Sequence, residues 1–470
     1  MRVSLARWAA LATAFAAVAA GFWLVASGRL GDAAAGPPEV HPSILLVTID
    51  TLRADHTSAY GYARPTTPRL AEIAKSGVRL DAAYAPMAAT APSHASMFTS
   101  LHPRTHGLMK NGLVLPPQHR RLAEILRENG YVTAAFVSSF AVNRRFGFEQ
   151  GFASYDDDFT GANSSLKMPD WAGVPAPQYF DRRAPETSAR VIAWLKRNGY
   201  LDHADTAPPP FFLWVHFFDP HDPYDPPPEE KALFAPEPPG DWLQGEIAEY
   251  DAEVHYADRG MGEIFDALAA AGRFDRVLTI VVGDHGEGLM QHGHMNHGLT
   301  IYEEQMRVPF VFHWPNGLGK PLAIDAPVQI VDLAPTVLDL AGIAPLPQFQ
   351  GMTLAPILRG EVGADPERPV YLQRRRYDSS LVQGIRVVGE QFGLRVGHWK
   401  YIEAPDEGTY ELFDLAKDPG EKANLFDARR DQASALAQVL HVWAQSPSGA
   451  PAESVSPEDA ERLRALGYVP

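Results

Sequence analysis

A threonine at the start of a predicted helix is the first candidate for chemistry in this sequence. Thr90 stands two residues before Pro92, and small and apolar residues continue at helical spacing to Ser100. Proline is favoured in the first turn of a helix, so a helix is expected to begin here. The free N–H groups of such an end bind phosphate or sulfate. An alcohol at this place indicates attack on a charged ester, although a threonine there is more often only a helix cap.

Carboxylates and imidazoles follow two other apolar runs of the chain. Asp50 ends the run 43–49, and Asp284 with His285 follows the run 277–282. Ligands of open α/β sheets bind beyond the carboxyl ends of the strands, so both groups are expected at one edge. Further histidines follow closely: His292, His294 and His297. So many acids and imidazoles in one stretch are typical of a metal site.

A third apolar run, 211–218, contains His216 and leads directly into Asp219 and His221. Prolines between 220 and 228 favour a rigid loop after this strand. Asp219 and His221 could form a ligand pair, and a turn held by the Asp219 side chain is the open alternative. His106 could face the site or simply lie in a turn.

The elements that must position these residues alternate between strands and helices. Helices are predicted at 67–74, 122–129, 182–198 and 245–271, and a further buried strand at 131–137. This pattern predicts an α/β domain at 43–345, with a mostly parallel sheet flanked by helices.

The pattern changes after residue 345. Short strands at hairpin spacing are predicted at 384–388, 392–396, 399–402 and 410–415, and a helix at 431–443. They predict a small C-terminal antiparallel sheet with a packing helix at 346–445, followed by a tail at 446–470. The run Arg374 to Arg376 is expected to be a solvated run, and an anion clamp is the open alternative.

Composition limits the classes of partner. The chain has 470 residues, a net charge of −16 and no cysteine. The negative charge argues against nucleic acid and anionic membrane surfaces. Without cysteine there is no disulfide, thiolate metal site or cysteine nucleophile.

The N-terminus indicates export. Arg2 and Arg7 precede the uncharged run 8–27, which is just long enough to span a bilayer. Residues 1–27 are expected to be a membrane anchor or a cleaved signal peptide, and 28–42 a linker. The body is therefore predicted to face the periplasm from the inner membrane, or to be secreted if the signal is cleaved.

The motifs in their order resemble the sulfatase family of the alkaline phosphatase superfamily. They are Asp50, the segment 90–93, the segment 216–223, the segment 283–287, the segment 302–309, the segment 332–336 and the segments 399–401 and 411–421. The resemblance covers roughly residues 42 to 470 and implies an alkaline-phosphatase-like α/β fold.

The sequence departs from that family at its nucleophile. Sulfatases carry a Cys or Ser that is oxidised to formylglycine, followed by x-Pro-Ser-Arg; here Thr90 and His94 stand at the two ends of that motif. Asp284 is followed by His285 where an Asn is expected, and the expected active-site lysines are missing. The pattern resembles the Thr-nucleophile branch, which includes phosphodiesterases and phosphoethanolamine or phosphoglycerol transferases.

This resemblance implies a divalent metal held by Asp50, Thr90, Asp284 and His285. Imidazole in place of carboxylate favours zinc or manganese over calcium or magnesium. His221 and His297 would contact the transferred group, protonate the leaving alcohol, or hold a second metal with Asp219; His292 is a further candidate for that role. Three more histidines are candidates near the site: His94, His106 and His216.

The expected function is hydrolysis of phosphate mono- or diesters through a covalent Thr90 intermediate. Three alternatives stay open: hydrolysis of sulfate esters on the same scaffold, transfer of the phospho group to an envelope glycan or lipid, and an inactive binding scaffold. The substrate is expected to be a small-molecule, glycan or lipid ester. The sequence does not predict an oligomeric state.

Overall fold

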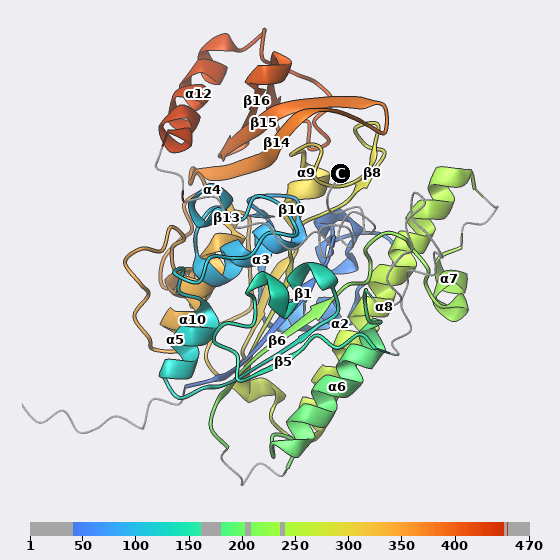
Figure 1. Cartoon of the computed structure of the whole chain (residues 1–470), viewed down its shortest axis with the longest axis vertical. Helices are drawn as coiled ribbons and strands as arrows, with labels where there is room; N and C mark the ends of the chain where they lie inside the picture. Colours follow the sequence, from blue (N-terminus) through green and yellow to red (C-terminus); the bar gives the residue numbers. More distant parts are fainter. Residues whose placement is uncertain (1–40, 161–179, 203–207, 236–239, 446–448, 450–470) are drawn as a thin grey trace, which may run out of the picture. The chain divides into compact units, whose positions relative to one another are not determined.

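A computed structural model describes residues 41–160, 180–202, 208–235, 240–445 and 449 (Figure 1). Residues 42–470 form one unit, and residues 1–41 form another. The predicted anchor or signal peptide at 1–27, nearly all of the linker at 28–42 and nearly all of the tail at 446–470 lie outside the described residues. Within the described ranges, no helix is both long and apolar enough to cross a membrane.

The apolar runs of the sequence form the centre of an eight-stranded sheet with the order β12-β2-β11-β7-β1-β6-β4-β5. β1 (Ser43–Ile49) pairs in parallel with β6 (Phe211–Phe217) and with β7 (Val277–Gly283). These strands are almost entirely buried, because helices cover both faces of a parallel sheet. The outer strands are β4 (Val132–Val137), β5 (Ser154–Asp156), β11 (Phe310–His313), β2 (Val78–Leu80) and β12 (Leu322–Ile324).

Most neighbours in this sheet are parallel, as predicted, and the exception lies on one side. β11 runs antiparallel to β7, and β2 runs antiparallel to β11. The ends of β1, β6 and β7 coincide, since Ile49 pairs with both Phe217 and Gly283. The residues that follow these three strands therefore emerge side by side at one edge of the sheet.

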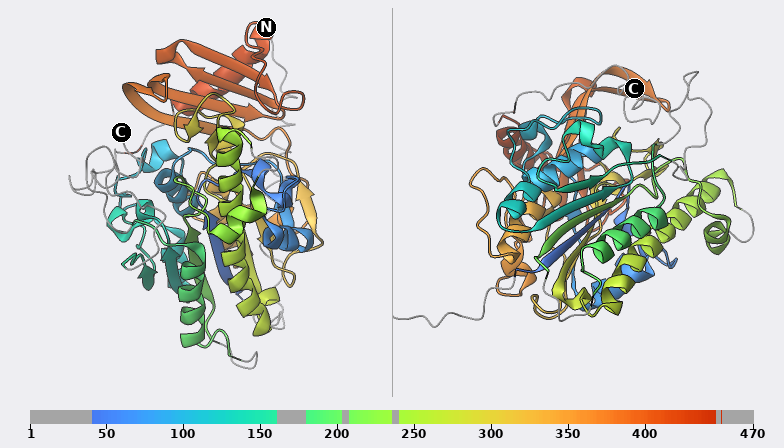
Figure 2. Two further views of the ribbon diagram at one scale, coloured as in Figure 1. Left: turned by 90° about the vertical axis from the view of Figure 1, so that its right-hand side faces the viewer. Right: turned by 60° about the horizontal axis from the view of Figure 1, so that its bottom comes forward.

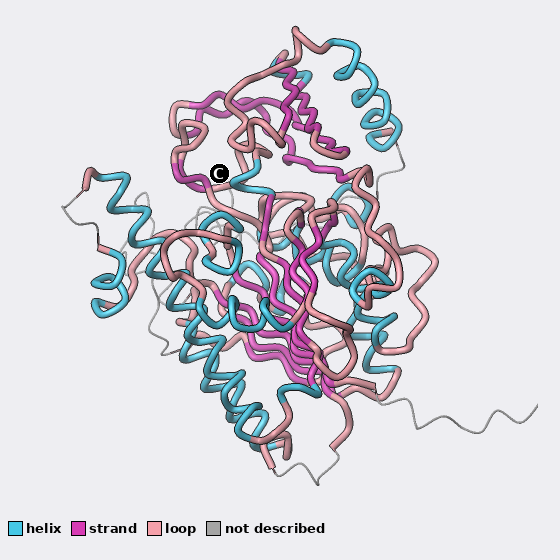
Figure 3. The backbone as a smooth tube through the Cα atoms, turned by 180° about the vertical axis from the view of Figure 1, so that it is seen from behind, coloured by secondary structure: helices cyan, strands magenta, loops and turns pink. Residues whose placement is uncertain are grey.

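Helices cover both faces of the sheet, as Figures 2 and 3 show. Alternate residues of β1 pack in opposite directions: Ile44 and Leu46 belong to one apolar cluster, and Leu45 and Val47 to the other. The first cluster includes residues of α3 (Thr90–Thr99), α5 (Leu122–Glu128) and α10 (Leu333–Leu340). The second includes residues of α2 (Pro68–Ser76), α6 (Ala184–Arg197) and α8 (Trp242–Ala270).

Short elements join these layers. The short helices are α4 (Pro103–His106), α7 (Pro228–Phe234), α9 (Glu303–Met306) and α11 (Ala355–Leu358). The short strands are β3 (Ala83–Tyr84), β8 (Gly288–Leu289), β9 (Met295–Asn296), β10 (Arg307–Val308) and β13 (Val328–Gln329).

The C-terminal part is a four-stranded antiparallel sheet with a covering helix, as predicted. Its strands are β14 (Val370–Val382), β15 (Ile385–Val396), β16 (Trp399–Ala404) and β17 (Thr409–Asp414), and its helix is α12 (Arg430–Ala444). A buried ion cluster joins this sheet to the α/β part. Lys400 Nζ of β16 lies 3.0 Å from Glu303 Oε1 of α9 and 2.9 Å from Glu421 Oε1.

Three local predictions need correction. The two strands predicted at 384–388 and 392–396 are one strand, β15, because β14 pairs with both parts across irregular register. His106, expected either to face the site or to lie in a turn, is part of the short helix α4. Arg374 is not solvated: it is buried in β14, and Glu407 Oε1 lies 2.7 Å from its Nη2.

Candidate active site

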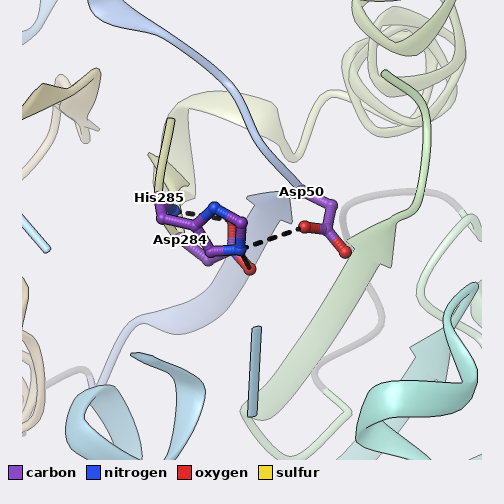
Figure 4. A group of neighbouring side chains, drawn as sticks. All are labelled: Asp50, Asp284 and His285. Atoms are coloured by element: carbon purple, nitrogen blue, oxygen red, sulfur yellow. Dashed lines mark hydrogen bonds and ion pairs between the residues drawn. The ribbon is translucent and has the colours of Figure 1, made fainter. Parts of the chain in front are cut away.

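Three predicted metal ligands meet at the edge where the central strands end. Asp50 follows β1, and Asp284 and His285 follow β7 (Figure 4). One ligand atom of each residue lies within 4.8 Å of the others. His285 Nε2 is 3.5 Å from Asp50 Oδ1 and 3.7 Å from Asp284 Oδ2. Parallel pairing of β1 with β7 brings together residues that are far apart in the sequence.

The geometry of this group fits a divalent cation. Asp284 Oδ1 accepts hydrogen bonds from Thr51 N at 3.1 Å and His285 N at 2.7 Å, whereas Asp284 Oδ2 is buried without a partner. His285 Nδ1 donates to the Gly286 carbonyl at 3.0 Å, so Nε2 of the neutral ring carries a lone pair, and it too is buried without a partner. Buried polar atoms of this kind normally have hydrogen-bond partners, and His285 Nε2 faces Asp50 Oδ1.

Burial dominates the electrostatics of the group. All three side chains are fully buried. Desolvation raises the pKa of Asp50 and of Asp284 well above the usual range for a carboxyl group, and it lowers the pKa of His285 well below the usual range for an imidazole. A cation bound between them would reverse this penalty by favouring the ionised carboxylates and the neutral ring.

Thr90 lies beside Asp50 as the first residue of α3. Its Oγ1 is 3.5 Å from both carboxylate oxygens of Asp50, and the side chain is fully buried. The anion-binding helix end predicted for α3 is mostly closed. Ala91 N donates to Asn111 Oδ1 at 2.8 Å, Ser93 N donates to the Ala89 carbonyl at 3.0 Å, and the proline between them has no N–H.

A hydroxyl that the sequence analysis missed organises the histidines behind this group. Thr48 Oγ1 lies 3.0 Å from His216 Nδ1 and 3.0 Å from His94 Nε2, and it accepts from Trp214 Nε1 at 2.9 Å. All four side chains are fully buried. The only available signal was that Thr48 is a polar residue among the buried apolar residues of β1.

The hydrogen bonds of this network fix both rings. His94 Nδ1 donates to the Thr90 carbonyl at 2.8 Å, so Nε2 of the neutral ring accepts the hydroxyl proton of Thr48. His216 Nδ1 must then donate to Thr48, and its Nε2 lies 3.6 Å from Asp50 Oδ2. Burial lowers the pKa of His216 to about 3 and that of His94 well below the usual range, which favours these neutral rings.

Two further predicted histidines lie next to the ligand group. The ring of His297 is 4.4 Å from that of His285 and 5.2 Å from that of His221. His221 Nδ1 donates to the Asp222 carbonyl at 2.6 Å, and His297 Nδ1 lies 3.1 Å from Glu287 Oε1. Burial lowers the pKa of His221 to about 3 and of His297 to about 4. Burial therefore favours the neutral form of both rings.

The structure places the remaining candidates in other contacts. Asp219 Oδ1 accepts from Arg183 Nη1 at 3.0 Å and its Oδ2 from Ala184 N at 2.9 Å, so both oxygens are used at the start of α6. His292 Nδ1 lies 2.7 Å from Glu304 Oε1, and its ring stacks on Tyr302. His106 and His294 contact hydroxyls of Ser96 and Thr300.

A second metal held by Asp219, His221, His297 or His292 stays a prediction, although both oxygens of Asp219 already accept hydrogen bonds. Among the described residues, the only group of three or more potential metal ligands is the one formed by Asp50, Asp284 and His285. The sequence could not show that Arg183, which lies far from Asp219 along the chain, would take its carboxylate.

Comparison with protein families identifies the family of the chain. The family model Sulfatase matches residues 42–343. The chain belongs to the sulfatase family. A second model of this family's proteins, N-sulphoglucosamine sulphohydrolase, C-terminal, matches residues 291–443. As a member of this family of metal-dependent hydrolases, the chain is an enzyme.

Its sulfatase relatives include proteins of similar length and longer ones. A Delta 4,5-hexuronate-2-O-sulfatase of Bacteroides thetaiotaomicron is 24% identical over 424 residues, which are 83% of this chain and 86% of that protein. Human arylsulfatase K is 34% identical over 195 residues, 41% of this chain and 35% of that protein. The chain thus aligns with only about a third of the latter relative.

Solved structures share the sulfatase fold. A protein in complex with its substrate D-glucosamine-2-N,6-O-disulfate superimposes with a TM-score of 0.71 and 20% identity, covering 86% of this chain and 98% of that one. The phosphonate monoester hydrolase of Agrobacterium radiobacter superimposes with a TM-score of 0.68 and 22% identity, covering 86% and 96%. At this level of identity the structures support the fold alone.

Proposed function

We propose that this sulfatase-family enzyme hydrolyses phosphate esters through a covalent intermediate on Thr90. The position of Thr90 Oγ1, 3.5 Å from both oxygens of Asp50 at the start of α3, is the observation that carries the proposal. A threonine has a methyl group on Cβ, so its oxidation cannot give the aldehyde of formylglycine. Thr90 must therefore act as an alcohol.

Asp50, Asp284 and His285 would hold the divalent cation, with zinc or manganese favoured by the mixed oxygen and nitrogen donors. When bound, the cation would supply positive charge that favours ionisation of the Thr90 hydroxyl and offsets the charge on the transferred group. Asp50 and the Thr48 network orient Thr90 for attack. His94, which donates to the Thr90 carbonyl, fixes the first turn of α3.

The proton balance follows from the neutral rings of His221 and His297. Thr90 Oγ1 forms a bond to phosphorus, and the bond from phosphorus to the ester oxygen breaks. The proton of Thr90 passes to one of these imidazoles and from there to the leaving oxygen, which departs as an alcohol. Water then attacks phosphorus, gives its proton to the same ring and releases phosphate, and the ring returns the proton to Thr90.

Sulfate esters are the second candidate, and the comparisons support them better than phosphate esters. The curated relatives include the hexuronate sulfatase and arylsulfatase K, whereas phosphorus chemistry is represented by the phosphonate monoester hydrolase structures. With sulfate, the same attack would give a sulfo-threonine that water must clear. The similarity to sulfatases therefore favours sulfate esters as substrates, whereas the threonine nucleophile favours phosphate esters.

We also propose that the enzyme acts outside the cytoplasm on small-molecule or glycan esters. The apolar run 8–27 and the basic residues before it support export. The relatives include a hexuronate sulfatase, and a similar solved structure contains a glucosamine disulfate, which supports sugar substrates. Transfer to a glycan acceptor in place of water would use the same intermediate.

Turnover of matched esters of one phenol tests the proposal. The full chain is assayed with the phosphate monoester, the phosphodiester and the sulfate, each with zinc, manganese or calcium. Phosphate turnover is expected with zinc or manganese. Turnover of sulfate alone would contradict the phosphate proposal and establish the second candidate.

Replacing the nucleophile tests the covalent route separately. Thr90→Ala is expected to lower kcat by about a thousandfold or more, while elemental analysis still finds the metal. The matched control is Thr99→Ala in the same helix, whose Oγ1 bonds only to the Ala95 carbonyl at 2.6 Å, and which is expected to keep activity. Full activity of pure Thr90→Ala protein would exclude the covalent intermediate.

A further inference from the structure

A cavity of about 60 Å³ lies between the α/β part and β14, directly beside the site. Its lining includes Ala89, which precedes Thr90, and His297, whose ring contacts that of His285. The opposite wall is formed by β14, which lies over this end of the central sheet near α3 and α9 (Figure 1). A hydrogen bond from Gln373 N to the Pro86 carbonyl, 2.9 Å long, holds β14 against the segment before Thr90.

The cavity carries positive charge. Lys110 and Arg375 line it, and none of the described lining residues is acidic. The Arg375 guanidinium lies 3.9 Å from the centre of the Tyr377 ring, which orients it without neutralising it. Its neighbours on β14 differ from it: Arg374 is paired with Glu407, and Arg376 is exposed and does not line the cavity.

Two buried polar atoms of the wall lack partners. Gln373 Nε2 donates to Glu390 Oε1 at 3.0 Å, which identifies Oε1 as the acceptor, and this oxygen makes no hydrogen bond. Arg374 Nε also makes none, although its other nitrogens bond to carbonyls and to Glu407. Both side chains are about 2% exposed. Buried polar atoms in native proteins are normally satisfied, so an acceptor and a donor in one wall point to a polar ligand.

We propose that this cavity binds a second anionic group of the substrate together with a neighbouring hydroxyl. The anion, a carboxylate or a second sulfate or phosphate, accepts hydrogen bonds from Arg375 and Arg374 Nε. The hydroxyl donates to Gln373 Oε1. This assignment rests on the proposed function, because it places the second group on the same substrate as the ester that Thr90 attacks. It selects acidic, hydroxyl-bearing substrates over neutral ones.

Matched esters and a neighbouring variant test the charge preference. Phenyl phosphate and phenyl sulfate are compared with the same esters bearing a meta-carboxyl or a meta-sulfonate group. Arg375→Gln is expected to raise KM for the acidic esters about tenfold or more and to change KM for the plain esters less than about twofold. Arg376→Gln removes the same charge one residue away and is expected to leave both unchanged.

The response of the two acidic esters separates the sources of the anion. If Arg375→Gln removes the preference for the carboxyl ester, the anion that the cavity binds is a carboxylate. If it removes the preference for the sulfonate ester, the anion is a sulfate- or phosphate-like group. An equal effect of Arg375→Gln on plain and acidic esters, or equal effects of the two arginine variants, would overturn the proposal.

A binding measurement keeps this test separate from the catalytic proposal. Calorimetry of the Thr90→Ala variant with D-glucuronate, and with D-glucose as the neutral control, requires no turnover. Glucuronate is expected to bind and to lose about tenfold in affinity when Arg375→Gln is added, and glucose to bind more weakly than glucuronate. If no ester is hydrolysed but this pattern holds, the proposed function fails and the cavity assignment stands. Equal binding of glucuronate and glucose would overturn the assignment.

Discussion

Replacing Thr48 by valine isolates the hydroxyl that organises the histidines behind the site. Valine has nearly the shape of threonine, so the change leaves no cavity and removes only hydrogen bonds. Thr48 Oγ1 has partners in His94, His216 and Trp214, at 3.0, 3.0 and 2.9 Å. None of these partners is exposed to water, so none can replace the lost bond with solvent.

The expected loss of stability follows from counting these partners. A net hydrogen bond contributes about 1 kcal/mol, and a buried group left without a partner costs about 1–3 kcal/mol. Loss of three buried contacts is therefore expected to lower the free energy of unfolding by about 3–5 kcal/mol. Because the rings of His94 and His216 would no longer be fixed beside Thr90 and Asp50, kcat is expected to fall by about tenfold to a hundredfold.

Thr279 provides the matched control in the same sheet. It is fully buried in β7, and its Oγ1 has no hydrogen-bond partner. Thr279→Val is therefore expected to leave the free energy of unfolding unchanged or to raise it by up to about 1 kcal/mol. Urea unfolding and steady-state kinetics of both variants give the comparison. Equal stability of the two variants would refute the role assigned to Thr48.

The other predictions concern the stability of the folded chain. Burial lowers the pKa of His102 from about 6.5 to about 4, so only the unfolded chain takes up this proton between those values and stability falls as the pH falls through that window. His102→Gln is expected to remove about 2 kcal/mol of the acid sensitivity measured by urea unfolding at pH 7 and pH 4.5; an unchanged pH profile would contradict this. Lys400→Met leaves buried Glu421 and half-buried Glu303 without this cation and is expected to cost about 3–5 kcal/mol, whereas exposed Lys417→Met should cost about 0–1 kcal/mol. Removing bound metal with a chelator should lower the unfolding temperature of the wild type but not of Asp284→Asn, and equal shifts would argue against the assigned ligands.

The sequence predicts the parts of the fold and site that depend on local pattern. Apolar runs of β-branched and aromatic residues mark β1, β6 and β7, because buried parallel strands need apolar residues on both faces. Chemistry at the carboxyl ends of such strands is a topological rule, so Asp50, Asp284 and His285 could be placed together before the structure was known.

The rest depends on contacts between distant residues. Nothing near Asp219 in the sequence indicates that Arg183 will take its carboxylate. Nothing near Arg374 in the sequence indicates that Glu407 will pair with it. The three adjacent arginines therefore look solvated, although Arg374 is buried and Arg375 lines a cavity. The first turn of α3 looked open to anions because Asn111, which occupies Ala91 N, belongs to a different loop.

The pairing of β1 has a consequence for the order in which the chain is made. This strand lies between β6 and β7, which are complete only when residues 217 and 283 have been synthesised. At about 5–20 residues per second, an almost wholly apolar strand waits about 10 s or more for either neighbour. The site that contains Thr90 and Asp50 is likewise incomplete until Asp284 and His285 have been synthesised. The nascent chain is therefore inert and prone to aggregation until well over half of it has been made, and a chaperone that covers β1 during this interval would raise the yield of active enzyme.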